Sequence, residues 1–495
     1  MSFPERDRAC GALLGTAAGD ALGAGYEFDP PRGAQEPVAM IGGGLGGFAR
    51  GEWTDDTSMA VAIAKVAATG ADLCDEAEQD LIVKRWYEWS LGAKDIGVQT
   101  SSVLRSAKHR GISARTAREE SEALHDRTGR TAGNGSLMRT APVALAYLDD
   151  DEAALAKAAR VISELTHYDP DAGDACVLWC AAIRHAVRTA KLDVRVGLDL
   201  LDIERRELWA ARLDEAEASQ PAAFASNNGW VVAALQGAWS AIFTTSVPDE
   251  SPAEGVFEVD HLRLALEAAV RGGGDTDTVA AIAGGLLGAA YGASTVPSQW
   301  RLVLHGWPGL RGDDLVRLAE KIIDKGRPDN FDYTYNGYPE ARQVVRHPHD
   351  EKVWIGGFAG LQHLPNGVDA VVSLCRVAYR DPLDPPDPAD PLAGMTRLDV
   401  RLIDNDDDND HLDFVLLDAA RAVEHLRAEG RTVFLHCVQA YSRTPTIAAL
   451  YGARRQHLAI DDAMRDVLKV LPGADPRRAF QKALRRLHPA AGGGD

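Results

Sequence analysis

The chain has 495 residues and a formal net charge of −20, with 45% apolar and 25% charged residues. This is the composition of a globular protein long enough for two unequal domains. Because so negative a surface repels phosphate backbones and anionic lipid, it argues against non-specific nucleic-acid binding and against membrane binding. Six scattered cysteines do not form a disulfide framework, and the charged first residues lack the apolar run of a signal peptide, so we expect a cytoplasmic protein.

Residues 1–325 are rich in Ala and Gly and have helical periodicity in their apolar residues. Few windows alternate in the manner of a strand, so this part is predicted to be an all-helical domain. The polar, Pro-containing stretch 326–345 is interpreted as a linker. The clearest helical windows are 59–68, 153–165, 172–189, 262–270 and 314–325.

Residues 346–488 have a different pattern, in which short β-like runs alternate with helical windows. This pattern predicts an α/β domain with a partly parallel sheet. The segment 380–394 contains many Pro and Asp residues, which exclude helix and central strand, and it is predicted to be a loop. The predicted strands are 352–357, 369–375, 397–403 and 432–437, and the predicted helices are 412–428 and 444–456.

Two Thr/Asp clusters precede small apolar helices, WTDDTSMAVAIAKV at 53–66 and GGDTDTVAAIAGGL at 273–286. Thr or Asp at such a place ordinarily caps the helix, and this interpretation stays open for either cluster alone. Capping needs one carboxylate, however, and each cluster has two, which repel each other unless a cation lies between them. Such oxygen ligands suit Mg²⁺ or Mn²⁺, as one ion or two, and disfavour zinc. The candidate ligands are Thr54, Asp55, Asp56, Asp275, Asp277 and Thr278.

Six motifs, in this order, resemble those of the ADP-ribosylglycohydrolases: GALLGTAAGDALGAGYEF (11–28), WTDDTSMA (53–60), KDIGVQT (94–100), AGNGSLMRTAPV (132–143), THYDP (166–170) and GGGDTDTVAAIAGGLLGAAYG (272–292). These are all-helical enzymes with two metal ions and include the dinitrogenase-reductase-activating glycohydrolase. The resemblance implies that the six candidate ligands bind two ions. It also implies that Asn134, Gly135 and Ser136 form the ADP-ribose-binding loop and that His167 lies in the pocket wall.

The implied reaction is hydrolysis of the N- or O-glycosidic bond between ADP-ribose and a modified protein or small acceptor. A metal pair can hold the ribose hydroxyls and activate water. Glu27 and Asp95 are the other carboxylates in the motifs, and either could orient the water or move a proton. Glu27 could instead form a hydrogen bond to a residue that binds the metal. Asp95 could cap a helix or close a turn, and His167 could be a core histidine. A different nucleotide-like substrate also stays open, because fold alone does not choose it.

The segment 432–455 has the pattern of a strand, a loop and a helix, with Cys437 and Arg443 at C-x₅-R spacing. A thiol at a strand end that faces a helix N-terminus and a guanidinium is expected to be a thiolate. The loop N–H groups and Arg443 form a cradle for one phosphoryl group, and the Thr444 hydroxyl could assist hydrolysis of a thiophosphate. The segment resembles the cysteine-dependent dual-specificity phosphatases, which implies a phosphorylated substrate and a bifunctional enzyme.

The general acid of such a phosphatase falls in the Asp-rich stretch 403–410, at Asp404 or Asp406, with Asp404 ranked slightly ahead. Ala440 stands where the family usually has Gly. At this position the backbone bends around the anion, and Ala would cost about 1–2 kcal/mol if its φ were positive. The alternative is therefore a binding module, in which the helical domain binds ADP-ribose and the C-terminal domain is a pseudophosphatase that binds phosphate without turnover.

Overall fold

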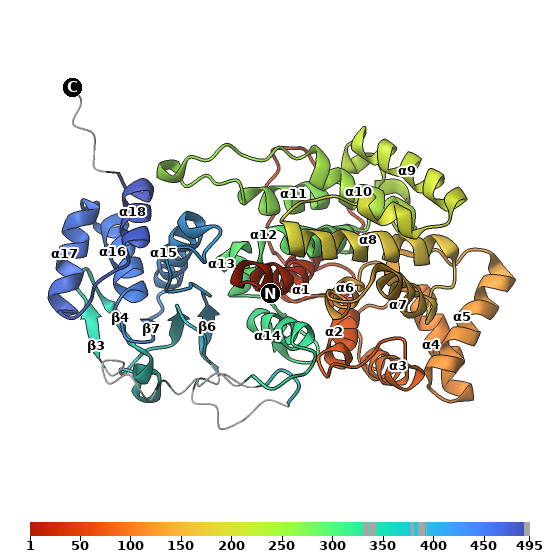
Figure 1. The fold of residues 1–495 in the computed structure, drawn as a ribbon, viewed down its shortest axis with the longest axis horizontal. Helices are drawn as coiled ribbons and strands as arrows, with labels where there is room; N and C mark the ends of the chain where they lie inside the picture. Colours follow the sequence, from red (N-terminus) through yellow and green to blue (C-terminus); the bar gives the residue numbers. More distant parts are fainter. Residues whose placement is uncertain (330–334, 336–342, 378–380, 385–391, 393, 490–495) are drawn as a thin grey trace. The chain divides into compact units, whose positions relative to one another are not determined.

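The computed structural model of the chain forms two compact units (Figure 1). Unit 1 comprises Met1–Ser246, His261–Val296 and Val303–Pro328, and unit 2 comprises Val247–Asp260, Pro297–Leu302 and Asp329–Asp495. The structure describes residues 1–329, 335, 343–377, 381–384, 392 and 394–489. Most of the predicted linker 326–345 and more than half of the predicted loop 380–394 lie outside the described residues.

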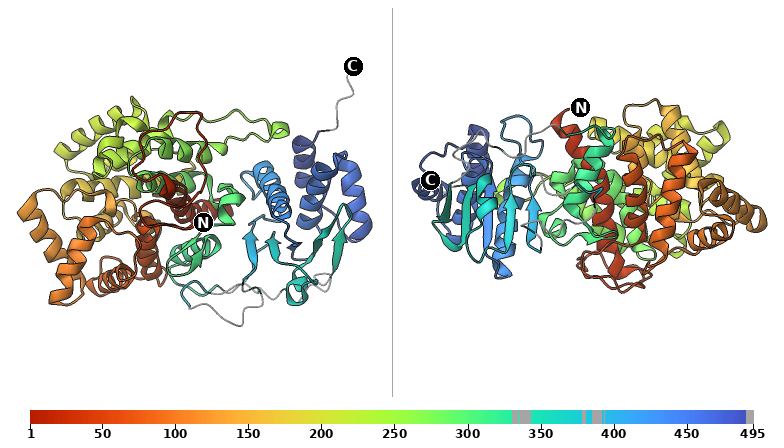
Figure 2. Two further views of the ribbon diagram at one scale, coloured as in Figure 1. Left: turned by 180° about the vertical axis from the view of Figure 1, so that it is seen from behind. Right: turned by 90° about the horizontal axis from the view of Figure 1, so that it is seen from below.

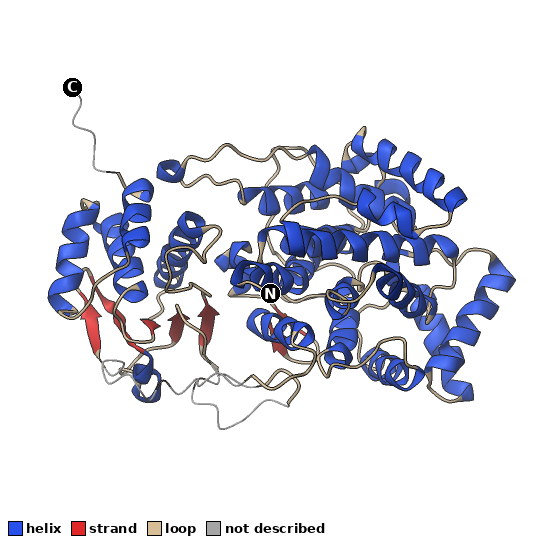
Figure 3. Cartoon of the chain, viewed as in Figure 1, coloured by secondary structure: helices blue, strands red, loops and turns tan. Residues whose placement is uncertain are grey.

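Unit 1 is built almost entirely of helices (Figure 3). It departs from the all-helical prediction at one short antiparallel ribbon, in which β1 (His305–Gly306) pairs with β2 (Leu310–Arg311). Its helices are α1 (Phe3–Gly23), α2 (Asp55–Ala67), α3 (Glu76–Ser90), α4 (Val98–Arg110), α5 (Ala114–Thr128), α6 (Ala141–Ala146), α7 (Glu152–Glu164), α8 (Pro170–Thr189), α9 (Ile203–Glu217), α10 (Val231–Thr244), α11 (Asp260–Arg271, from His261 onward), α12 (Thr276–Tyr291) and α14 (Gly312–Ile323).

The predicted helices all occur, but several begin before the apolar pattern does. Helix α2 was predicted from residue 59 and begins at Asp55, so that Asp55 and Asp56 lie in its first turn. Carboxylates are favoured there because the first N–H groups of a helix carry a partial positive charge. Periodicity detects the buried stripe of a helix, and polar first turns lie outside it.

Helices α1 and α12 run side by side through the centre of unit 1 and are buried over most of their length (Figure 2). Glycines on both helices allow the backbones to touch. A Cβ added to Gly11 would lie 2.1 Å from the carbonyl oxygen of Gly288, and one added to Gly23 would lie 2.5 Å from the Cα of Asp277. The glycines of this contact are Gly11, Gly15, Gly19 and Gly23 on α1 and Gly284 and Gly288 on α12.

Unit 2 contains a five-stranded sheet in the order β3-β4-β7-β5-β6. The four predicted strands form its parallel part, and the edge strand β3 pairs antiparallel with β4. The strands are β3 (Val344–His347), β4 (Asp350–Gly357), β5 (Ala370–Ser373), β6 (Thr396–Asp399) and β7 (Val433–Cys437), and the helices are α13 (Ser298–Arg301), α15 (Leu412–Ala428), α16 (Arg443–Gln456), α17 (Ile460–Val470) and α18 (Arg478–Leu487).

Two segments that precede residue 326 in the chain belong to unit 2. In the first, Phe257 packs edge-on against Phe414 of α15, with ring centroids 5.6 Å apart. In the second, the hydroxyl of Ser298 donates to the carboxylate of Asp418 at 2.9 Å. These contacts join residues far apart in sequence, so the texture of the sequence did not indicate them.

All six cysteines are free, as the sequence predicted, and Cys176 and Cys180 are buried in α8. Within the described residues, every helix is too short or too polar to cross a membrane.

Candidate functional site

Carboxylates from three helices of unit 1 meet in one buried cluster. Asp20 of α1, Asp56 of α2 and Asp277 of α12 each offer an oxygen, and these oxygens lie within 4.8 Å of one another. A second group of the same kind is formed by Glu27, Asp275 and Asp277. The two groups share Asp277, so together they form one continuous acidic centre.

Asp20 is the member that the sequence analysis missed. Its carboxylate accepts hydrogen bonds from the N–H of Thr54 at 2.8 Å and from the N–H and hydroxyl of Thr57 at 3.0 and 2.6 Å. Asp20 thus fastens the start of α2 to α1 and completes the acidic cluster. The signal was a single carboxylate in the Ala- and Gly-rich stretch GTAAGDALG, which is buried throughout and contains no other charged residue.

Asp56 has a carboxylate oxygen that no group of the described protein satisfies. Its Oδ2 accepts from the Thr54 hydroxyl at 2.9 Å, whereas Oδ1 is buried without a hydrogen-bond partner. An unsatisfied carboxylate oxygen at full burial is costly unless a cation pairs with it. The oxygen-only donor set suits a hard divalent cation, so the residues present fit a metal site.

The pKa values of the carboxylates in the cluster also fit a site for a cation. Burial, together with the charge of neighbouring carboxylates, raises the pKa of Asp55 to about 7 and that of Glu27 to about 8. Burial also raises the pKa of Asp20 to about 6, against the hydrogen bonds that it accepts. The pKa values of Asp56 and Asp277 are likewise raised by burial and by their acidic neighbours. The centre is therefore short of positive charge.

Asp275 is held at the start of α12 by two asparagines. Asn134 Nδ2 donates to Asp275 Oδ2 at 2.7 Å, and the N–H of Asp275 donates to Asn228 Oδ1 at 2.9 Å. Gly274 has a φ of +73°, and a Cβ there would lie 2.6 Å from Asn228 Oδ1. Glycine at this position thus allows the close approach of Asn228 to the start of α12. Thr278 lies beside the cluster, where its N–H donates to Asp277 Oδ1 at 3.0 Å.

Asp55 and Asp95 lie on the side of the cluster that faces the start of α4. Asp55 Oδ2 accepts from the N–H of Gly97 at 3.3 Å, and Asp95 Oδ1 accepts from the N–H of Ile96 at 2.8 Å. The second contact is a local one, to the residue that follows Asp95. Burial is the largest factor that raises the pKa of Asp55 and of Glu27, and the negative charge of Asp95 is the second largest. Asp95 therefore also influences the charge of the acidic centre.

The predicted ADP-ribose loop, Asn134–Ser136, is a single 3₁₀ turn beside the cluster. His167 is buried and lies close to this turn. A Cβ added to Gly135 would be 3.1 Å from Cε1 of His167. The structure therefore brings together the loop, His167 and Asp275, which come from three distant motifs.

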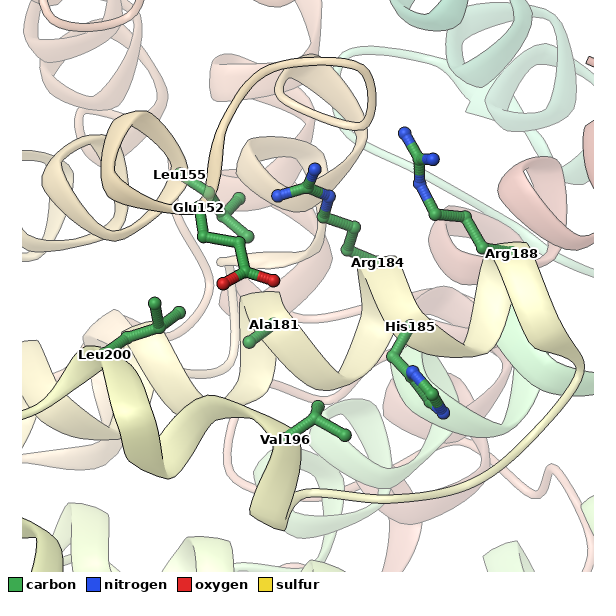
Figure 4. A pocket seen from close by; sticks show the side chains of 8 residues that line it. All are labelled: Glu152, Leu155, Ala181, Arg184, His185, Arg188, Val196 and Leu200. Atoms are coloured by element: carbon green, nitrogen blue, oxygen red, sulfur yellow. The ribbon is translucent and has the colours of Figure 1, made fainter.

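A separate cavity of about 270 Å³ lies between α7, α8 and the 3₁₀ helix Arg195–Leu200 (Figure 4). Its rim carries Arg184, His185 and Arg188, but Arg184 donates to the carbonyl of Asp150 and Arg188 pairs with Asp149 at 3.3 Å. None of the residues that line it belongs to the acidic cluster.

In unit 2, the C-x₅-R loop connects β7 to α16. Cys437 is the last residue of β7, opposite Gly357 in the parallel register, and α16 begins at Arg443. Such a loop lies where α/β sheets bind ligands, beyond the carboxyl ends of parallel strands. Cys437 is 2% exposed.

The Arg443 guanidinium is anchored at one end. Nη1 donates to the carbonyls of Leu374 and Leu402 at 2.9 and 3.0 Å, whereas the buried Nε has no hydrogen-bond partner among the described residues and lies 3.6 Å from Asp404 Oδ2. The guanidinium is thus held in place through Nη1, and other N–H groups of it are left to donate hydrogen bonds to a ligand. Thr444 is fully buried, and its hydroxyl donates to the Gly356 carbonyl at 3.3 Å.

The two candidates for the general acid differ in position. Asp404 is half-buried and pairs with Arg443 and also with Arg477, whose Nε lies 3.3 Å from Asp404 Oδ1. Asp406 is exposed, and its N–H bonds to the side chain of Asn405. Asp404 is therefore the candidate that lies beside Arg443, and the choice between the two residues stays a prediction.

Ala440 has a φ of +58°, in the left-handed region. The strain that the sequence analysis expected for a positive φ at this position is therefore present, at about 1–2 kcal/mol. The side chain of Ala440 does not offset this strain, because a methyl group makes no hydrogen bond.

The helical fold and the buried acidic centre define unit 1 as a helical domain with an oxygen-rich site, and comparison with known proteins identifies its family. Residues 2–330, more than half of the 495-residue chain, match the family model of the ADP-ribosylglycohydrolases. The chain therefore belongs to the ADP-ribosylglycohydrolase family, as its motifs predicted.

The curated relatives match the part of the chain that the family model covers. The chain is 31% identical over 324 residues to the ADP-ribosylarginine hydrolase Tri1 of Pseudomonas putida, which covers 64% of this chain and 78% of that protein. It is 30% identical over 310 residues to the ADP-ribosyl-[dinitrogen reductase] glycohydrolase of Rhodospirillum rubrum (59% and 89%). The crystal structure of human DUSP28 is 21% identical, with a TM-score of 0.24, and covers 29% of this chain and 92% of that chain.

Proposed function

We propose that unit 1 removes ADP-ribose from a modified protein or small acceptor with the help of two divalent cations, Mg²⁺ or Mn²⁺. The observation that carries this proposal is the pair of carboxylate groups that share Asp277, one of which contains Asp56 with its unsatisfied Oδ1. Asp20, which the sequence did not single out, joins the proposed ligands Thr54, Asp55, Asp56, Asp275, Asp277 and Thr278.

When bound, the cations would hold ribose hydroxyls and lower the pKa of a water molecule. The protein's own groups position the other parts of the substrate. The Asn134 amide and the turn that follows it lie directly beside Asp275, so a substrate on this turn has its ribose at the acidic centre. Glu27, whose pKa is raised to about 8 by burial and neighbouring carboxylates, suits transfer of a proton to or from the departing group.

The relatives' names indicate the first linkage to test. One is an ADP-ribosylarginine hydrolase and another acts on ADP-ribosylated dinitrogen reductase. We therefore propose an N-glycosidic bond to an arginine side chain as the preferred substrate of this chain, ahead of O-linked and free nucleotide-like substrates.

The test is release of ADP-ribose from peptides modified at arginine or at serine, with Mg²⁺, with Mn²⁺ and with a chelator. We expect release with either metal, faster from arginine, and none with the chelator. Absence of release from every peptide by folded protein with metal would contradict the proposal. The Asp277→Asn variant is the matched negative control, because it keeps the size and shape of the side chain.

We propose that unit 2 is a cysteine-dependent phosphatase. The Cys437 thiolate would attack phosphorus, so that an S–P bond forms while the ester P–O bond breaks and the departing oxygen takes a proton from Asp404. Water would then cleave the thiophosphate and release inorganic phosphate. The Arg443 guanidinium supports this role, because it is anchored through Nη1 and its Nε makes no hydrogen bond among the described residues. Donors of the guanidinium are thus left to bind the phosphoryl group.

The strained Ala440 favours the second candidate, a domain that binds phosphate without turnover. Hydrolysis of para-nitrophenyl phosphate distinguishes the two. Turnover that is lost in Cys437→Ser supports the phosphatase, whereas saturable phosphate binding without turnover supports the binding module.

A further inference from the structure

A buried chain of three side chains leads from the core of unit 1 to the turn Asn134–Ser136. It begins at Arg139, which is fully buried and lies over the ring of Trp86, 4.0 Å from the ring centroid. Arg139 Nη2 donates to the Thr166 hydroxyl at 2.8 Å, and this hydroxyl lies 2.7 Å from Nδ1 of His167. The proposed reaction uses neither Arg139 nor Thr166.

The direction of the hydrogen bonds in this chain follows from the chemistry of its first member. A guanidinium group has donors and no acceptor, so the Thr166 hydroxyl accepts from Arg139. Thr166 is fully buried. Among the hydrogen bonds of its hydroxyl within the described residues, Nδ1 of His167 is the atom that can accept the hydroxyl proton. A buried hydroxyl proton left unpaired is costly, so the hydroxyl donates to Nδ1.

An imidazole that accepts at Nδ1 carries its proton on Nε2 when it is neutral. The ring is kept neutral because burial, assisted by the charge of Arg139, lowers the pKa of His167 well below its usual value. Nε2–H is then a donor of known direction. It faces the turn, since a Cβ added to Gly133 or Gly135 would lie 3.2 Å from Nε2.

An acceptor lies next to this donor. The side-chain amide nitrogen of Gln99 donates to the carbonyls of Thr131 and Thr166 at 2.9 and 2.8 Å, which fixes the orientation of the amide. The oxygen of this amide, Oε1, then lies beside Gly133, as does Nε2 of His167. A Cβ on Gly133 would be 3.3 Å from Gln99 Oε1. Glycine at position 133 puts no side chain into this place.

We propose that Arg139 and Thr166 are positioning residues that hold His167 as the Nε2-protonated tautomer, so that His167 Nε2–H and Gln99 Oε1 together bind one hydroxyl group of the substrate. A hydroxyl group both accepts and donates, as this pair requires, whereas a phosphate oxygen only accepts. The inference rests on the proposed function in that the hydroxyl is taken to be a ribose hydroxyl of ADP-ribose.

The tautomer is measured first, in the ligand-free full chain labelled with ¹⁵N-histidine. Long-range ¹H–¹⁵N correlation distinguishes protonated from unprotonated ring nitrogens, and the signals of His167 are assigned by their loss in His167→Gln. We expect Nε2 to be protonated and Nδ1 to be unprotonated. In Thr166→Val, which keeps the shape but removes the hydroxyl, we expect a mixture of tautomers, whereas Thr166→Ser should retain the wild-type pattern.

Ligand binding is measured second, by calorimetry with ADP-ribose in the presence of Mn²⁺. We expect Thr166→Val to weaken binding about tenfold and Thr166→Ser to change it little. Among ADP-ribose analogues that each lack one ribose hydroxyl, one should bind about tenfold more weakly than ADP-ribose to the wild type. It should bind as well as ADP-ribose to a variant that combines His167→Gln with Gln99→Leu, since that variant has lost the pair.

A wild-type spectrum with the proton on Nδ1 would overturn the inference, and so would a Thr166→Val spectrum unchanged from the wild type. If Thr166→Val does not fold, the wild-type spectrum still decides. If the wild type binds no ADP-ribose although its His167 is protonated on Nε2, the proposed function fails and the positioning by Arg139 and Thr166 stands.

Discussion

Gly15 of α1 lies against Gly284 of α12 so closely that a Cβ added to Gly15 would be 2.2 Å from the carbonyl oxygen of Gly284. This approach sets the distance between the two helices that carry Asp20 and Asp277. Two separated sequence motifs can therefore supply carboxylates to one centre. The packing of small residues is thus a condition of the site as well as of the fold.

Replacing Gly284 by Ala should push α1 and α12 apart. Because the new Cβ would lie 2.1 Å from the carbonyl oxygen of Gly15, we expect the free energy of unfolding to fall by about 1–3 kcal/mol or more, with weaker divalent-metal binding. Gly237→Ala in α10 is the matched control, since its Cβ would make ordinary contacts at 3.5 Å and Ala favours helix by up to about 1 kcal/mol. Chemical denaturation of both variants checks this prediction, and equal effects would contradict it.

Replacing Asp277 by Asn should remove the carboxylate that the two acidic groups share. We expect no calorimetric signal for Mn²⁺ binding and loss of ADP-ribose release by at least about 100-fold. The metal-free variant should melt at a higher temperature than the metal-free wild type, because buried repulsion is relieved. Asp199→Asn, at a side chain that is 86% exposed and paired with Arg206, should change none of these quantities.

The stability of the metal-free protein should depend on pH through Glu27. Burial and neighbouring carboxylates raise its pKa from 4.5 to about 8 in the folded state, so the folded state holds the extra proton between these values. The stabilisation is therefore complete below pH 4.5 and is lost as the pH rises through 8. We expect Glu27→Gln to gain in melting temperature over the wild type as the pH rises across this window. Saturating Mn²⁺ should abolish the difference, and a pH-independent difference without metal would contradict the assignment.

Replacing Ala440 by Gly should relieve the positive φ in the C-x₅-R loop. We expect unit 2 to be stabilised by up to about 1 kcal/mol, since the relief of about 1–2 kcal/mol exceeds the entropic cost of glycine, and phosphate to bind more tightly. The reciprocal control is Gly430→Ala at a φ of +83°, where a Cβ would meet nothing within 4 Å. That variant should lose about 1–2 kcal/mol through backbone strain alone. Thermal unfolding of both variants measures the effects, and opposite signs are expected.

Replacing Asp404 by Asn should slow turnover of para-nitrophenyl phosphate at its pH optimum by about 10²-fold or more, because the departing oxygen loses its proton donor. Asp406→Asn, at an exposed position in the same stretch, should leave the rate within a factor of about two. Steady-state kinetics of the two variants decide between the residues, and the opposite ranking would place the general acid at Asp406.

Much of the fold was predictable because helices and parallel strands have local periods. The helix 412–428 was predicted with the bounds that the structure has, and the four strands of the parallel part were predicted within a few residues. The family was also predictable, because its motifs are short and contiguous and the match over residues 2–330 confirms it. The roles of the individual site residues and the phosphatase activity stay predictions.

What the sequence alone determined is therefore the helical character of unit 1, the four parallel strands of unit 2, the family of unit 1 and most of the acidic residues of its centre, since each is written in a local run of residues. Only the tertiary structure decided that Asp20 joins the centre, that Gly274 makes room for Asn228, and that the segments Val247–Asp260 and Pro297–Leu302 belong to unit 2. These facts depend on which helices touch. A residue's own neighbours in the chain carry no information about a contact that is made 250 residues away, as between Thr276 and Gly23.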